Sequence, residues 1–106
     1  MKPSIGRIVH YILTDQDAKA IGRRHVPGVG HGEGWPAGAQ AHVGNPHSAG
    51  QHVPAIVVVV WPNEYGPDFD GINAQVFLDG NESLWVMSVK EGTEPGSWHW
   101  PERVSE

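Results

Sequence analysis

Residues 72–90 read INAQVFLDGNESLWVMSVK, and the alternation within this stretch decides the fold. Its first half places an apolar residue at every second position, which is typical of a strand with one buried face. These positions are Ile72, Ala74, Val76 and Leu78. The pair Asp79 and Gly80 favours a hairpin turn, after which residues 84–90 return as a second strand. The stretch therefore predicts two antiparallel neighbours.

Three further segments have strand character. Residues 53–61, VPAIVVVVW, form a continuous apolar run, which predicts a central strand that is buried on both faces. Residues 5–13, IGRIVHYIL, are rich in β-branched and aromatic side chains and predict another strand that is covered on both sides. Residues 98–102, WHWPE, predict a short edge strand with Trp98 and Trp100 together on one face, in the core or at a subunit interface.

One segment has the start and stop signals of a helix. Residues 14–24, TDQDAKAIGRR, begin with Thr14 as the N-cap, and Asp17 stands three residues on, as in a capping box. Short sequential strands with tight turns and one helix predict a mainly β (α+β) fold, with residues 1–106 as a single domain. We expect a small antiparallel sheet or partly open barrel of about five strands, with one short helix and a long Gly/His-rich loop.

Composition and charge exclude several classes of function. Acidic residues outnumber basic ones 12 to 7 and the formal net charge is -5, so we expect no non-specific binding to nucleic acid. The chain has no cysteine, which excludes disulfides, thiolate chemistry and cysteine-ligated zinc. Its longest apolar run is far shorter than a membrane span and its first residues do not resemble a signal peptide, so we expect no membrane association.

Residues 25–52 contain five of the seven histidines and no convincing periodic segment. Within them, His42, His47 and His52 are spaced by five residues, a spacing that falls within the range seen in zinc sites. Shared ligation of a metal by these three is disfavoured, because Pro46 disrupts any helix there and no HExxH motif is present. We favour solvated or backbone-bonded histidines, and we expect no cofactor.

The same loop favours a small-molecule site over an active site. The chain lacks a G-x-S-x-G elbow, and its run GVGHGEGW lacks the strand and the lysine of a phosphate-binding loop, so we expect a protein that is not an enzyme. Arginine forks bind phosphate, and tryptophan and amide side chains can hold a base. The candidate ligand-binding residues are Arg23, Arg24, Trp35, Gln40, His42 and Asn45. The alternative is that both arginines cap the helix and Trp35 packs the loop onto the sheet.

Four segments resemble small accessory proteins encoded by tailed phages and prophages. They are GRIVHY at 6–11, GAQAHVGN at 38–45, QVFLDGNESLWVMSV at 75–89 and PGSWHWPE at 95–102. The resemblance covers most of the chain and implies a protein of the bacterial host cytoplasm or, alternatively, of the virion. It carries over no functional residues.

Three hypotheses of function follow. The first is a non-enzymatic phage binding protein that sequesters a host nucleotide immune signal, as an anti-defence sponge, and that forms a homo-oligomer to bury exposed tryptophan. The second is a structural accessory of the virion, such as a decoration or head-tail protein. The third is a zinc-dependent hydrolase that uses His42 and His47.

Overall fold

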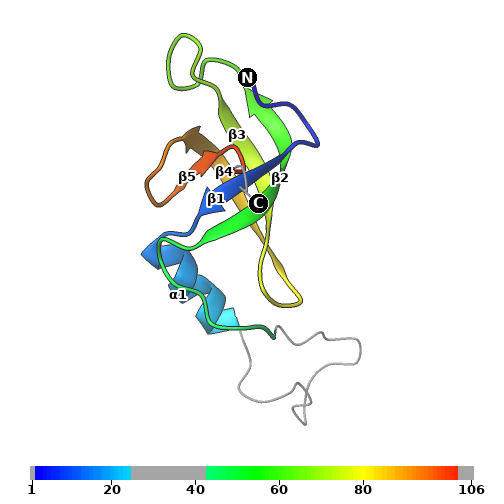
Figure 1. The fold of residues 1–106 in the computed structure, drawn as a ribbon, viewed down its shortest axis with the longest axis vertical. Helices are drawn as coiled ribbons and strands as arrows, with labels where there is room; N and C mark the ends of the chain where they lie inside the picture. Colours follow the sequence, from blue (N-terminus) through cyan, green and yellow to red (C-terminus); the bar gives the residue numbers. More distant parts are fainter. Residues whose placement is uncertain (1, 25–42, 103–106) are drawn as a thin grey trace.

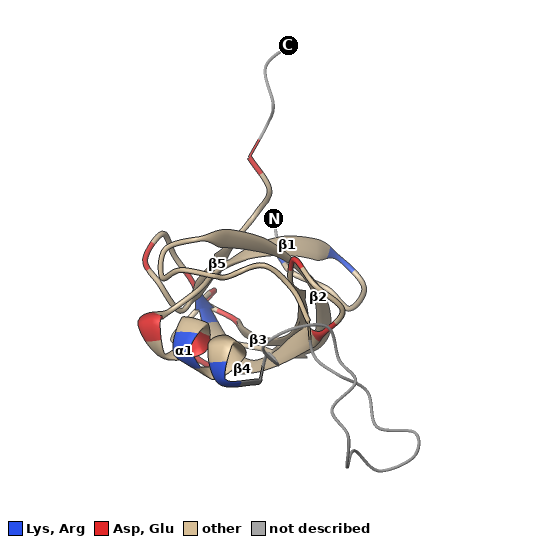
Figure 2. Ribbon diagram, turned by 90° about the horizontal axis from the view of Figure 1, so that it is seen from below, with Lys and Arg blue, Asp and Glu red and all other residues tan. Residues whose placement is uncertain are grey.

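The computed structural model describes residues 2–24 and 43–102, which form a closed five-stranded barrel with one helix (Figure 1). The strands are β1 (Ile8–Ile12), β2 (His52–Trp61), β3 (Gly71–Phe77), β4 (Ser83–Glu91) and β5 (Ser97–His99), and the helix α1 (Asp15–Arg24) follows β1. Figure 2 looks along the barrel and shows the strands as a ring, with α1 at the near end. The prediction of a mainly β fold with five strands and one short helix is confirmed.

The ring is closed by its shortest strand. The strands β1 to β4 form an antiparallel meander, and β5 lies between β4 and β1. β5 pairs antiparallel with β1 at two positions and parallel with β4 at two positions, so the sheet is mixed rather than purely antiparallel. A short connection can reach this parallel register because Gly96, with φ of 88°, takes a left-handed conformation that glycine adopts without strain.

Inward side chains from every strand fill the barrel. They are Val9, Tyr11, Val53, Ala55, Val57, Ile72, Ala74, Val76, Val89 and Trp98. The prediction that β2 is buried on both faces is wrong, because Val57 is fully buried whereas its neighbour Val58 is 36% exposed. The same correction applies to β1, where Ile8 is exposed. A barrel is one sheet closed on itself, so in the described part of the chain no second layer covers its outer face.

Two tryptophans anchor the closing strand. Trp98 is the largest fully buried side chain, and Trp100 packs against the core with its ring centroid 5.5 Å from that of Trp98. The guanidinium carbon of Arg7 lies 5.3 Å from the centroid of the Trp100 ring, a cation–π contact. The prediction that the two indoles share one face is confirmed, and of the two predicted places, the core or a subunit interface, Trp98 lies in the core.

The helix begins with the predicted capping box. The Asp17 backbone N–H donates to Thr14 Oγ1 at 2.9 Å, and the Thr14 backbone N–H donates to Asp17 Oδ2 at 3.0 Å. The same carboxylate oxygen accepts a 2.6 Å hydrogen bond from the Tyr11 hydroxyl. Burial, and then this carboxylate, raise the pKa of Tyr11, so the phenol stays protonated and donates. Asp17 therefore joins the start of α1 to the core side of β1.

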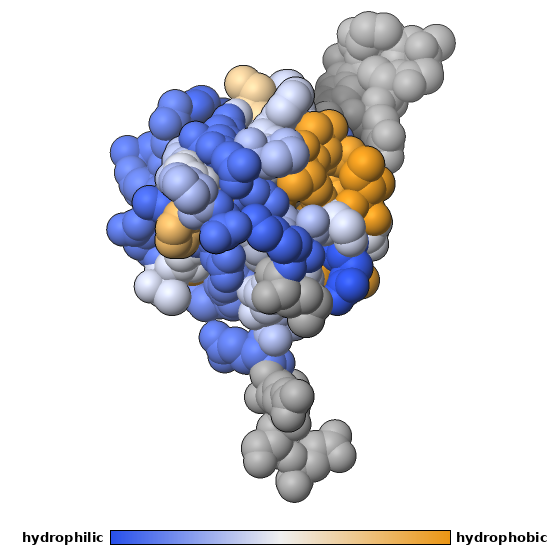
Figure 3. Space-filling model, turned by 90° about the horizontal axis from the view of Figure 1, so that it is seen from above, coloured by the Kyte–Doolittle hydropathy of each residue, from blue (hydrophilic) through white to orange (hydrophobic). Residues whose placement is uncertain are grey.

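The outer positions of the barrel differ in character from strand to strand. Figure 3 shows a compact hydrophobic area beside a largely hydrophilic surface. The exposed large apolar side chains are Ile5, Ile8, Val58, Trp61, Tyr65, Phe69, Phe77, Trp85 and Met87. Outer positions of β1, β2 and β5 also carry histidines. No helix in residues 2–24 and 43–102 has the length and apolar character needed to cross a membrane.

We expect Asp17→Ala to lower the free energy of unfolding by about 1–3 kcal/mol, because the buried Tyr11 hydroxyl and the Thr14 N–H both lose their acceptor. Asp15→Ala is the matched control. Asp15 belongs to the same helical turn but pairs only with the exposed Lys19 at 3.0 Å, which predicts a loss of about 0.5 kcal/mol or less. Urea unfolding of both variants measures the difference, and equal losses would contradict this role of Asp17.

Candidate metal centre

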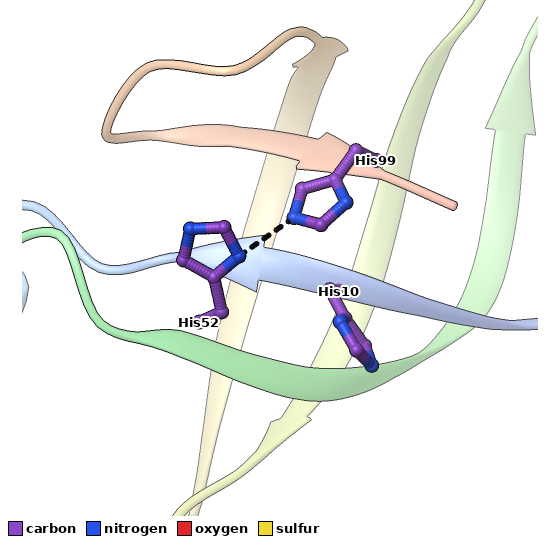
Figure 4. A group of neighbouring side chains, drawn as sticks. All are labelled: His10, His52 and His99. Carbon is purple, nitrogen blue, oxygen red and sulfur yellow. Dashed lines mark hydrogen bonds between the residues drawn. The ribbon is translucent and has the colours of Figure 1, made fainter. Parts of the chain in front are cut away.

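Three histidines from three neighbouring strands converge on the outside of the barrel (Figure 4). His10 lies on β1, His52 on β2 and His99 on β5. One ring nitrogen from each lies within 4.8 Å of the other two. Figure 4 shows the His52 and His99 rings turned toward each other, with His10 beside them.

Strand alternation explains why the three rings meet. Each histidine is next in sequence to a buried residue, namely Val9 and Tyr11, Val53, and Trp98, so its own side chain points outward. The register then places His10 directly opposite His99, and places His52 opposite Ile12, two residues along β1 from His10. Facing and diagonal positions of adjacent strands are close enough for such side chains to touch.

The hydrogen bonds of His99 fix which ring nitrogen can bind a metal. His99 Nδ1 lies 2.8 Å from the Trp100 carbonyl oxygen, which can only accept, so Nδ1 carries the hydrogen. In the neutral ring, Nε2 then has a free lone pair. His52 Nδ1 lies 2.9 Å from this Nε2 and donates to it. A metal ion bound between His52 Nδ1 and His99 Nε2 would replace the proton of this hydrogen bond.

The spacing of His52 and His99 fits a divalent transition-metal ion, and the His10 ring would have to turn toward them to complete the ligand set, because the three nitrogens are spread over 4.8 Å. Two imidazole nitrogens on one tetrahedral zinc ion are about 3.3 Å apart, because each Zn–N bond is about 2.0–2.1 Å long. The 2.9 Å separation of the His52 and His99 nitrogens is close to this distance. The bond from His99 Nδ1 to a backbone carbonyl is the outer contact that orients metal-binding histidines. Three imidazoles suit Zn²⁺, Cu²⁺ or Ni²⁺, whereas Mg²⁺ and Ca²⁺ require oxygen ligands.

The electrostatics of the cluster keep His10 neutral. His10 and His99 are half-buried and His52 is exposed. The pKa of His10 is lowered, first by burial and then by the neighbouring His99 and His52 rings, while the Glu102 carboxylate acts in the opposite direction. A neutral imidazole is the form that binds a metal, so His10 is available as a ligand at neutral pH.

The structure assigns the predicted metal candidates to different places. His52 belongs to the cluster, and among the described residues its partners there are His10 and His99 rather than His47. His47 Nε2 accepts a 3.2 Å hydrogen bond from the Asp79 backbone N–H, in agreement with the backbone-bonded interpretation. His42 lies outside the described residues.

The predicted ligand-binding residues are not brought together among the described residues. Trp35, Gln40 and His42 lie outside them, as does the side chain of Arg24. Arg23 is exposed in the last turn of α1. The Asn45 side chain instead donates to the Asp79 carboxylate at 2.8 Å, and its backbone N–H donates to the Asp79 carbonyl at 2.9 Å. Asn45 therefore attaches its segment to the β3–β4 turn.

No pocket is formed by residues 2–24 and 43–102. Comparisons of the chain with protein-family models, with curated proteins and with solved structures find no match.

We expect the metal-free protein to lose stability as the pH falls below 6.5, the ordinary pKa of histidine. The folded-state pKa of His10 is below this value, so the unfolded chain takes up its proton first, and stability declines until the pH has passed the folded-state pKa. Urea unfolding in the presence of a chelator, from neutral to mildly acidic pH, measures this decline.

In the same measurements, His10→Asn should show a smaller decline, because the substituted side chain does not titrate. The groups that act on His10 (His52, His99 and Glu102) stay in place in this variant. Superimposable pH profiles for the two proteins would contradict this account of His10.

Proposed function

We propose that the protein binds a divalent transition-metal ion through His10, His52 and His99. The observation that carries the proposal is the convergence of three imidazole nitrogens within 4.8 Å, from three strands that are adjacent in the barrel. The oriented His99 ring and the neutral His10 ring support it. The proposal departs from the expectation, drawn from the sequence, that no cofactor is needed.

The position of the cluster suggests what the metal does. β5 has three residues and is paired at only two positions with each neighbour. A metal held by all three histidines would tie β5 to β1 and β2, across the point where the barrel closes. The metal would then stabilise the closure of the barrel. Because only three ligands come from the protein, it would also keep a coordination position open to solvent.

Binding is favoured over catalysis. Three histidine ligands with an open position are also the ligand set of catalytic zinc. Hydrolysis further requires walls that position a substrate and exclude water, and residues 2–24 and 43–102 form no pocket that could provide them. A zinc-dependent hydrolase is therefore the less favoured use of this centre.

Titration calorimetry of the untagged, chelator-treated protein tests the proposal. We expect binding of Cu²⁺, Zn²⁺ and Ni²⁺ with one ion per chain, with Cu²⁺ bound most tightly and Mg²⁺ and Ca²⁺ not bound. His99→Ala should weaken binding by at least about 100-fold, because loss of a ligand costs no less than loss of an outer contact. When the free metal concentration is 100 times the dissociation constant, the metal should raise the free energy of unfolding by about 2.7 kcal/mol.

His47→Ala is the matched control for these titrations. It removes a histidine that lies outside the cluster and contacts the Asp79 backbone, so metal affinity should not change. The proposal fails if wild-type protein binds none of the three metals, or if His47→Ala and His99→Ala weaken binding equally.

Nucleotide sequestration in the host cytoplasm is the second candidate function. It is supported by the exposed Arg23 at the end of α1, which leads into the residues that hold Trp35 and Gln40. Calorimetry with a panel of cyclic and linear nucleotides tests it, with Arg23→Ala and Arg24→Ala expected to weaken any binding by about tenfold or more. Stoichiometric presence of the protein in purified phage particles would instead favour the virion accessory.

A further inference from the structure

A second surface, independent of the metal centre, lies on the outside of β2, β3 and β4, and we call it the apolar face. It consists of the exposed side chains of Val58, Trp61, Phe77, Trp85 and Met87. Trp85 and Met87 on β4 are 57% and 61% exposed. The register sets Gln75 of β3 between Ile56 of β2 and Trp85 of β4, so these outer positions form a continuous row.

Asn73 orders the centre of the apolar face. The bulge of β2, between Val57 and Val59, lies opposite this residue, and so does the irregularity in β4. Asn73 Oδ1 accepts hydrogen bonds from Trp61 Nε1 at 3.0 Å and from the Ser88 backbone N–H at 2.8 Å. The indole and the bulge are thereby held in place before any partner binds, which reduces the entropy lost on docking.

Charge makes the apolar face suitable for self-association. The chain carries a formal net charge of -5, which opposes contact between two copies. However, neither β2 nor β3 contains a charged residue, and the charges of β4 are confined to its end, at Lys90 and Glu91. Glu64, in the β2–β3 connection, lies beside Gly71 opposite Trp61, so carboxylates stand at the rim of the apolar face and two faces can meet at their centres on Trp85 and Met87.

The size of the apolar face also fits a second copy. Five side chains that are each about half exposed offer on the order of 500 Å² of apolar surface. A specific interface buries about 800 Å² per partner, with a polar rim around its apolar centre. The apolar face thus supplies most of one side of a standard interface, and the surrounding polar residues supply the remainder.

The geometry points to a second copy of this chain as the occupant of the apolar face, through a two-fold symmetric contact centred on Trp85 and Met87. Symmetry presents the same uncharged aromatic surface from both sides, so each copy covers the indole of the other. A small apolar ligand would need a concave site, and the described residues form none. The contact leaves the metal centre uncovered, because His10 and His99 lie on β1 and β5, and His52 is the first residue of β2, whereas Val58 and Trp61 lie in the second half of that strand.

Sedimentation equilibrium of the chelator-treated protein, over two orders of magnitude in concentration, tests this inference. We expect a concentration-dependent particle of twice the 11.5 kDa chain mass. Trp85→Lys should weaken the dimer by at least about thirtyfold, since it removes a central aromatic contact and places like charges across the symmetry axis.

Phe69→Lys is the control, because Phe69 is 59% exposed in the β2–β3 connection, outside the apolar face. It should leave the dimer unchanged, and thermal unfolding should show that both variants fold. A wild-type chain that is monomeric throughout overturns the inference, as does equal dissociation of both variants. If the chain is monomeric and Met87 is protected from oxidation, another part of the same chain covers the apolar face. This result also overturns the inference.

Discussion

The burial of Trp98 is the interaction on which the rest of the structure depends. β5 contributes only two paired residues to each neighbour, too few to hold a strand by backbone hydrogen bonds alone. The indole of Trp98 fills the core and Trp100 packs beside it, so side-chain burial worth several kcal/mol keeps β5 in the ring. His99 lies between these two residues and inherits its position from them.

In this arrangement the two faces of a single sheet have different roles. The inner face is fully used by the core, as expected for a small barrel. Everything that could recognise another molecule within residues 2–24 and 43–102 therefore lies outside the ring. A cluster of three histidines lies on the outside of β1, β5 and the beginning of β2, whereas large apolar side chains lie on the outside of β3, β4 and the second half of β2. One short chain can in this way carry two surfaces of different chemistry.

Local patterns in the sequence predicted the elements, and long-range pairing explains what they missed. The alternation in residues 72–78 and the capping box at Thr14 and Asp17 are local signals, and both are confirmed. The continuous apolar run of β2 was misleading, because a run alone does not distinguish a strand between two layers from a strand in a barrel wall. The connection from β4 to β5 is short, and its sequence contains no signal that predicts parallel pairing of the two strands.

The metal centre was missed for a related reason. The spacing of histidines in the loop indicates His42 and His47 as candidate metal ligands, whereas His10 and His99 are single histidines in predicted strands. Their meeting depends on the register of β1 with β5, which a single sequence does not reveal. A usable signal was present, because each clustered histidine stands beside a core position of a strand. All three histidines occupy outward strand positions and therefore lie on the same side of the sheet.

The span of the cluster along the chain has a consequence for how the molecule is assembled. His10 and His99 are separated by 89 positions (99 − 10), so the centre joins the first strand to the last. Closing so large a loop costs more conformational entropy than pairing strands that are close in sequence. During synthesis, a chain that has not yet been extended to β5 holds two of the three imidazoles and lacks the third. The complete cluster can therefore form only after the segment that contains β5 has been made.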